Sequence, residues 1–163
     1  REVFPEARYV FVRRHGVDVA SSLCRRWKER QERKEWYDRA VKWLYPYSLR
    51  RRLNSCLHRF RTMEKAFTLW EEYLRVGAQN LQDVPENRVL RIRYEELLNE
   101  PKAEMERVAR FCGLEHEDGL LEAAIEQEGL RPDRALAYRE DAELRTFARE
   151  HRSRLEAAGY SAP

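Results

Sequence analysis

Residues 8–13 read R-Y-V-F-V-R, and together with the residues that follow they indicate the fold class. The β-branched and aromatic side chains of this run are apolar on both faces, which predicts a short interior parallel strand covered by helices on either side. The pair His15-Gly16 breaks this run, and an apolar stripe with a four-residue step then begins, formed by Val19, Leu23 and Trp27. The sequence therefore predicts a strand, a tight turn and a helix.

The rest of the chain alternates between helical patterns and one further strand. Residues 89–94, V-L-R-I-R-Y, place Arg91 and Arg93 on one face and apolar residues on the other, so this strand has a polar or ligand-facing side or lies at an edge of the sheet. Helical patterns are found near 36–45, before Pro46, and at 57–82, 95–98, 101–112, 117–127 and 141–157. The order predicts an α/β fold, mostly helical, with a few parallel strands.

Composition limits the classes of protein. A chain of 163 residues is long enough for one domain, and no apolar run approaches the length of a membrane span. The three cysteines, Cys24, Cys56 and Cys112, have no metal-binding or redox spacing, so we expect buried thiols in the cytoplasm and no metal. Residues 1–62 hold 17 Lys and Arg against 7 Asp and Glu, whereas residues 63–163 hold 15 against 22. An anion is therefore expected at the basic half.

A candidate anion site follows the first strand. Arg14, Asp18 and Ser22 are spaced four and four, so a guanidinium, a hydroxyl and the N–H groups at the start of the helix could converge on one phosphate. Asp18 suits the positive end of the helix dipole and could cap backbone donors. The alternative is a surface arginine and an ordinary helix serine.

Two segments carry a resemblance to a known family. The run F-P-E-A-R-Y-V-F-V-R-R-H-G-V-D-V-A-S-S-L resembles the 3′-phosphate-binding segment of sulfotransferases that use 3′-phosphoadenosine 5′-phosphosulfate (PAPS). The run V-L-R-I-R-Y-E-E-L-L-N-E-P-K-A-E-M-E-R-V-A-R-F-C-G-L is similar to the family's later strand and helix. The resemblance covers residues 4–114 and implies a partial P-loop-type three-layer fold.

The resemblance implies roles for individual residues. Arg14 and Ser22 correspond to the residues that bind the 3′-phosphate, and Tyr94 to one that packs against the adenine, although Tyr94 could equally be a core aromatic. The family returns a basic loop to the 3′-phosphate near its C-terminus, and among Arg131, Arg134 and Arg139 we select Arg134. The family's Arg-Lys-Gly pattern is absent there, which favours surface roles for these arginines.

We expect residues 1–163 to be the C-terminal part of a single sulfotransferase domain. Its parts are a strand–turn–helix at 4–30, an aromatic and basic insert at 31–56, a long helix at 57–82, a strand and helix at 88–113, and C-terminal helices at 117–160. None of the six glycines lies in a phosphate-cradling loop, so the loop for the 5′-phosphosulfate has no counterpart and this chain alone is expected to be inactive.

The implied reaction is transfer of a sulfuryl group from PAPS to a hydroxyl or amine on a small molecule or glycan, without a metal. The general base cannot be assigned: His15 is interpreted as a turn residue or accessory anion contact, and His58, His116 and His151 lack a partner at catalytic spacing. Two alternatives stay open: a non-catalytic module that binds anions or nucleic acid through the basic half, and a helical interaction protein.

Overall fold

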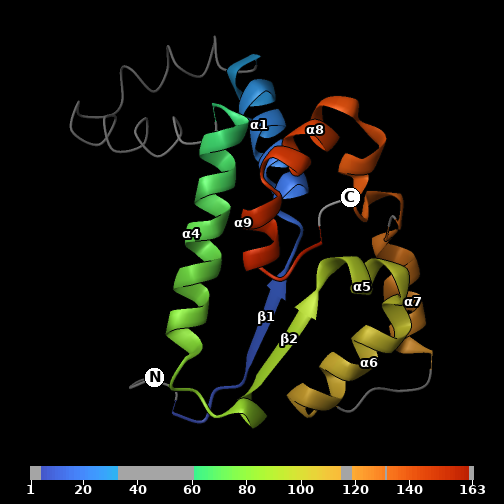
Figure 1. Cartoon of the computed structure of the whole chain (residues 1–163). Coiled ribbons are helices and arrows are strands. Elements are labelled where there is room, and N and C mark those ends of the chain that lie inside the picture. The colour runs from blue at the N-terminus through green and yellow to red at the C-terminus, as the bar shows by residue number, and fades with distance from the viewer. Residues whose placement is uncertain (1–4, 33–60, 115–118, 131, 162–163) are drawn as a thin grey trace, which may run out of the picture. The chain divides into compact units, whose positions relative to one another are not determined.

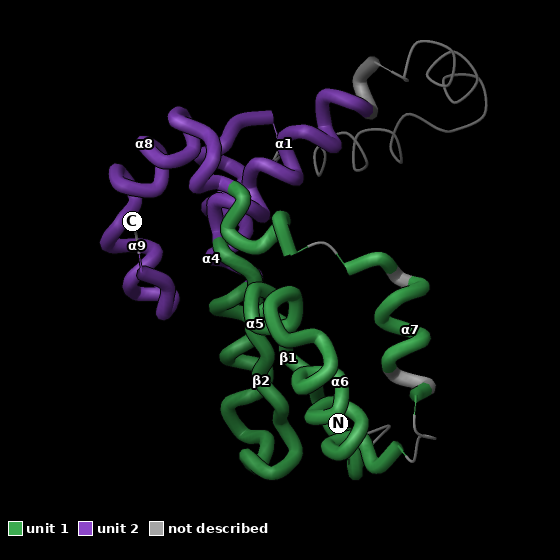
Figure 2. Tube along the Cα trace, turned by 90° about the vertical axis from the view of Figure 1, so that its right-hand side faces the viewer, with its two compact units in different colours: residues 1–15, 74–137 green, residues 16–73, 138–163 purple. Residues whose placement is uncertain are grey.

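The computed structural model describes residues 5–32, 61–114, 119–130 and 132–161. The chain forms two compact units, coloured separately in Figure 2. The first unit comprises Arg1–His15 and Leu74–Ala137, and the second comprises Gly16–Tyr73 and Tyr138–Pro163. The predicted insert at 31–56 and the predicted helix near 36–45 lie outside the described residues, apart from the last residues of the first helix.

The first unit is built on two parallel strands, β1 (Tyr9–Arg13) and β2 (Val89–Arg93), which lie side by side in Figure 1. They pair in register from Tyr9 opposite Val89 to Arg13 opposite Arg93. The remaining elements that lie wholly in this unit are η2 (Glu86–Arg88), α5 (Tyr94–Asn99), α6 (Pro101–Cys112), α7 (Leu120–Glu128) and η3 (Pro132–Arg134). The chain is mostly helical with a small parallel sheet, which confirms the predicted α/β class.

The faces of the two strands agree only in part with the prediction. In β2, Leu90 and Ile92 are buried and Arg91 is exposed, as the alternating pattern predicts. In β1, however, Val10 and Val12 are 39% and 51% exposed, so the expectation of a strand covered on both faces is wrong. An apolar run reports which side chains prefer burial, but the sheet's packing decides which of them are covered.

The other face of β1 packs closely against the C-terminal part of α4 (Met63–Leu81). A Cβ atom added to Gly77 of this helix would lie 2.7 Å from the ring of Phe11. Only a residue without a side chain allows this approach between helix and strand. Of the helix predicted at 57–82, the structure has Met63–Leu81 in helix and residues 61 and 62 in a bend, whereas residues 57–60 lie outside the described part of the chain.

The second unit packs around two aromatic residues of α4. Phe67 and Trp70 are 0% and 4% exposed, and their ring centroids are 5.0 Å apart. The elements that surround them are α1 (Gly16–Glu32), α8 (Ala142–Glu150) and α9 (Arg152–Ala157), with η4 (Ala137–Glu140) leading into them. A Cβ atom on Gly16 would lie only 2.6–2.7 Å from both aromatic rings, so glycine is required where α1 begins.

The C-terminal helix predicted over 141–157 is divided. His151 leaves the helical conformation, with φ −104° and ψ 21°, and separates α8 from α9. Its ring stacks on Phe147 at 4.0 Å between centroids and lies 5.4 Å from the ring of Phe67. The break has no Gly or Pro signal in the sequence, so local residue types do not predict it.

Two smaller expectations concern cysteines and membranes. Burial raises the pKa of the half-buried Cys24, with a smaller opposing effect of Lys28, whereas Cys112 at the end of α6 is exposed. The prediction of a buried thiol is thus wrong for Cys112, because the helix turns this residue outward. Cys56 lies outside the described residues.

No helix among the described residues has both the length and the apolar character that crossing a membrane requires.

Candidate functional site

The turn after β1 carries the arginine that the sequence selects. Arg14 and His15 follow the last residue of the strand, and α1 begins at Gly16. The Arg14 side chain is half-buried, whereas His15 is 1% exposed. The carboxyl ends of parallel strands are the usual position for ligands in α/β sheets. Arg14 therefore lies where an anion site is expected.

Three of the four predicted site residues meet in the first unit. The Cζ atom of Arg14 lies 4.8 Å from the centroid of the Tyr94 ring, which is a cation–π geometry. Nη2 of Arg14 donates a long hydrogen bond of 3.4 Å to the backbone carbonyl oxygen of Arg134. These residues are 80 and 120 positions from Arg14 in the sequence. The structure thus brings together a guanidinium, an aromatic ring and the returning C-terminal segment.

The geometry refines the interpretation of Tyr94 and Arg134. Tyr94 is the first residue of α5 and half-buried, and one face of its ring is covered by Arg14. Its ring therefore packs against the guanidinium, a contact that neither predicted role, adenine binding or core packing, includes. Arg134 approaches Arg14 through its backbone carbonyl, while its side chain is exposed.

Sequence reasoning missed a buried carboxylate in this group. Glu95 is 8% exposed, and its Oε1 accepts a hydrogen bond of 2.7 Å from the backbone N–H of His15. The sequence places Glu95 in a helical turn directly after Tyr94, a position where a carboxylate is ordinarily exposed. Only the pairing of the two strands shows that this residue reaches the turn after β1.

Asp18 and Ser22 belong to the second unit. Asp18 lies in the first turn of α1, is 5% exposed, and accepts a hydrogen bond of 2.9 Å at Oδ1 from the backbone N–H of Tyr138. It therefore binds a backbone donor, as expected, and this donor comes from η4. Ser22 is half-buried in α1. Its convergence with Arg14 on one phosphate stays a prediction.

The remaining candidates are placed as follows. Arg139 lies in η4, is exposed, and accepts a hydrogen bond at its carbonyl oxygen from Nη1 of Arg145. This places it on the surface, as the sequence favours. Three other candidates, Arg131, His58 and His116, lie outside the described residues.

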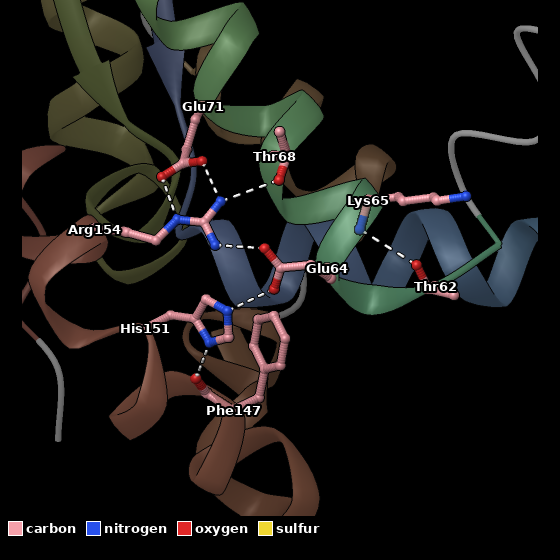
Figure 3. Close-up of polar contacts among 8 residues, drawn as sticks. All are labelled: Thr62, Glu64, Lys65, Thr68, Glu71, Phe147, His151 and Arg154. Carbon is pink, nitrogen blue, oxygen red and sulfur yellow. Dashed lines mark hydrogen bonds and ion pairs between the residues drawn. The ribbon is translucent and has the colours of Figure 1, made fainter.

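The second unit contains a separate polar cluster around Arg154, drawn in Figure 3. Its Nε and Nη2 atoms bind the carboxylate of Glu71, and Nη1 lies 2.6 Å from Oε1 of Glu64. The guanidinium also lies over the Phe67 ring at 4.8 Å. The hydrogen bond from Arg154, supported by a weaker one from His151, lowers the pKa of Glu64 against an opposing effect of burial. The hydrogen bond to Glu71 raises the pKa of Arg154.

His151 acquires in this cluster the acidic partner that sequence spacing could not show. Its Nε2 lies 2.6 Å from Oε2 of Glu64, and its Nδ1 lies 2.9 Å from the carbonyl oxygen of Phe147. These two contacts engage both ring nitrogens of His151. Through these contacts the histidine joins α4 to the α8–α9 junction.

The described ranges contain no group of three His, Cys, Asp or Glu side chains that could hold a metal ion. Whether the reaction proceeds without a metal is a separate matter, and that expectation stays a prediction.

The fold and this site define a class: an α/β protein with a guanidinium on an aromatic ring at the carboxyl end of a parallel strand. The chain belongs to the sulfotransferase family, since the model of that family matches residues 1–118. It is therefore assigned to the transferases that move sulfuryl groups. Searches of curated proteins and of solved structures returned no match to the chain.

Proposed function

We propose that this chain supplies the 3′-phosphate and adenine side of the nucleotide site in a sulfotransferase that uses PAPS as its donor. The supporting observation is the meeting of Arg14, Tyr94 and the Arg134 backbone, which come from three distant stretches of the chain. Arg14 binds the 3′-phosphate together with Ser22. The adenine packs near Tyr94, and the segment around Arg134 closes the site.

The orientation of Arg14 suits this role. The Cζ atom of Arg14 lies 4.8 Å from the centroid of the Tyr94 ring, and the N–H donors of a guanidinium lie along the edge of its plane. A phosphate approaching that edge can accept two parallel hydrogen bonds. Tyr94 therefore holds the cation in place without competing for its donors.

In the proposed reaction the sulfur–oxygen bond to the 5′-phosphate breaks and a bond forms from sulfur to an acceptor hydroxyl or amine. The products are the sulfated acceptor and 3′,5′-bisphosphoadenosine, and the acceptor loses one proton. The 3′-phosphate is remote from the reacting sulfur, so Arg14 contributes binding and orientation of the donor and no bond making. The acceptor is proposed to be a small molecule or a glycan.

Calorimetric titration of the chain with 3′,5′-bisphosphoadenosine and with 5′-AMP tests the proposal. We expect a strong preference for the bisphosphate. Arg14→Ala should weaken bisphosphate binding by about 1.5–3 kcal/mol, the usual scale for a hydrogen bond to a charged group, which is about 10- to 150-fold in Kd. Arg91→Ala is the matched control, because Arg91 belongs to the same sheet but forms an exposed ion pair with Glu86.

Equal affinity for the two nucleotides, or unchanged bisphosphate affinity in Arg14→Ala, would contradict the proposal. Binding that ignores the 3′-phosphate and weakens steeply with added salt would instead support the anion- or nucleic-acid-binding module.

A further inference from the structure

Buried charge in the first unit is concentrated at the turn that carries Arg14. Among the described residues of this unit, His15 and Glu95 are the buried polar or charged side chains. The Oε2 atom of Glu95 is buried as well and has no hydrogen-bond partner within the described part of the chain. Keeping a carboxylate in such surroundings costs free energy, so its contact with the His15 backbone needs an explanation beyond general stability.

The strand register explains how Glu95 reaches this position. The ladder between β1 and β2 ends at the pair Arg13 and Arg93. Beyond that pair the backbone of β2 turns into α5 at Tyr94 and leaves the ladder. The N–H of His15, two positions beyond the last pair, is bound at 2.7 Å by the side chain of Glu95. The carboxylate thus extends the pairing of the two strands past the end of the sheet.

Two consecutive residues therefore hold both parts of Arg14. The ring of Tyr94 lies under its guanidinium at 4.8 Å, and the carboxylate of Glu95 binds the peptide group that joins Arg14 to His15. One contact holds the main chain and the other the side chain, so together they restrict the orientation of Arg14. A pre-oriented guanidinium loses less conformational freedom when a phosphate binds.

We propose that Glu95 is a positioning residue for the 3′-phosphate: by accepting the His15 N–H it fixes the turn that aims Arg14. This inference rests on the proposed function of Arg14. It assigns to the R-Y-E-E-L stretch a second task besides contact with the adenine, namely discrimination between nucleotides that carry a 3′-phosphate and those that do not.

The test uses the full chain with Glu95→Ala, which removes the acceptor, and Glu95→Gln, which keeps an oxygen acceptor but removes the charge. Glu96→Ala is the matched control, since Glu96 is the next residue, is exposed, and lies 4.0 Å from Nε of Arg93. Each variant is titrated with 3′,5′-bisphosphoadenosine and with 5′-AMP, and its melting temperature is recorded.

For Glu95→Ala we expect about tenfold weaker binding of the bisphosphate. This corresponds to the low end of the free energy of one hydrogen bond to a charged group, because a misoriented Arg14 binds the phosphate less well. Binding of 5′-AMP should change by less than about threefold, so the ratio of the two affinities falls. Glu95→Gln should retain most of that ratio because its amide oxygen still accepts, and Glu96→Ala should match the wild type.

Each outcome separates the two proposals. A wild-type chain without preference for the bisphosphate refutes the function proposed for Arg14. A wild-type preference that survives unchanged in Glu95→Ala refutes the positioning role alone. A loss of affinity that is equal for both nucleotides in Glu95→Ala and in Glu95→Gln, accompanied by a lower melting temperature, assigns Glu95 to general stability and also overturns the inference.

Discussion

Replacing Gly16 by alanine tests the packing that fixes the start of α1. The added Cβ would lie 2.6 Å from a ring atom of Phe67 and 2.7 Å from two ring atoms of Trp70, whereas ordinary contact begins near 3.4 Å. The rings would have to move by about 0.7–0.8 Å. Phe67 is fully buried between Trp70, Phe147 and His151, so neither ring has space to yield.

Overpacking of this kind costs about 1–3 kcal/mol. Alanine is a better helix former than glycine by up to about 1 kcal/mol, but Gly16 is the first residue of the helix, where little of that gain applies. We therefore expect Gly16→Ala to lower the free energy of unfolding by about 2 kcal/mol. For a chain of this length that corresponds to a fall in melting temperature of about 4–8 °C.

The assay is urea denaturation followed by tryptophan fluorescence, with two comparisons. Gly77→Ala introduces the same methyl group against Phe11, whose ring is only half-buried, so it should cost less than Gly16→Ala. In a double-mutant cycle, Trp70→Leu removes two of the three close ring atoms, so the cost of Gly16→Ala should fall by at least half in that background. An unchanged cost there, or a Gly16→Ala variant as stable as the wild type, would refute the reasoning.

Two further predictions concern carboxylates of the second unit. The lowered pKa of Glu64 means that its bonds to Arg154 and His151 stabilise the folded state above the unfolded pKa of about 4.3, and that this contribution is lost as the pH falls through the folded value. Because Glu64 is 54% exposed, Glu64→Gln should lower the free energy of unfolding by only about 0.5–1 kcal/mol at pH 7. The difference in urea midpoint between this variant and the wild type should shrink as the pH is lowered toward 3. A difference that stays constant with pH would contradict this reasoning. Asp18→Ala should lower the free energy of unfolding by about 2–3 kcal/mol, because it removes the carboxylate that accepts from the N–H of the fully buried Tyr138. Asp18→Asn retains an oxygen acceptor and should lower it less. If chemical denaturation shows equal decreases for the two variants, hydrogen bonding is not the reason.

Local patterns predict a large part of the fold. The alternation of V-L-R-I-R gives the second strand with its polar face, and Pro101 and Gly113 bound α6 because proline suits the first turn of a helix and glycine accepts the left-handed conformation at its end, here φ 72°. Such signals lie within a few residues of the structure they cause, so they can be read along the chain. The break at His151 lacks one, and the ring of Phe67, from another helix, packs against His151 there.

The same distinction divides the candidate site. The sequence alone determined the position of Arg14 at the end of a strand and before a helix, because strand and helix periodicities meet there. Only the tertiary structure decided that Tyr94 lies beneath Arg14 and that Glu95 binds the next peptide group, because both depend on the register of two strands separated by 75 residues of chain. Hydrogen bonds between such distant residues have no period in the sequence. They form where the fold buries a donor next to an acceptor, because burial removes the water molecules that would otherwise be hydrogen-bonded to both groups.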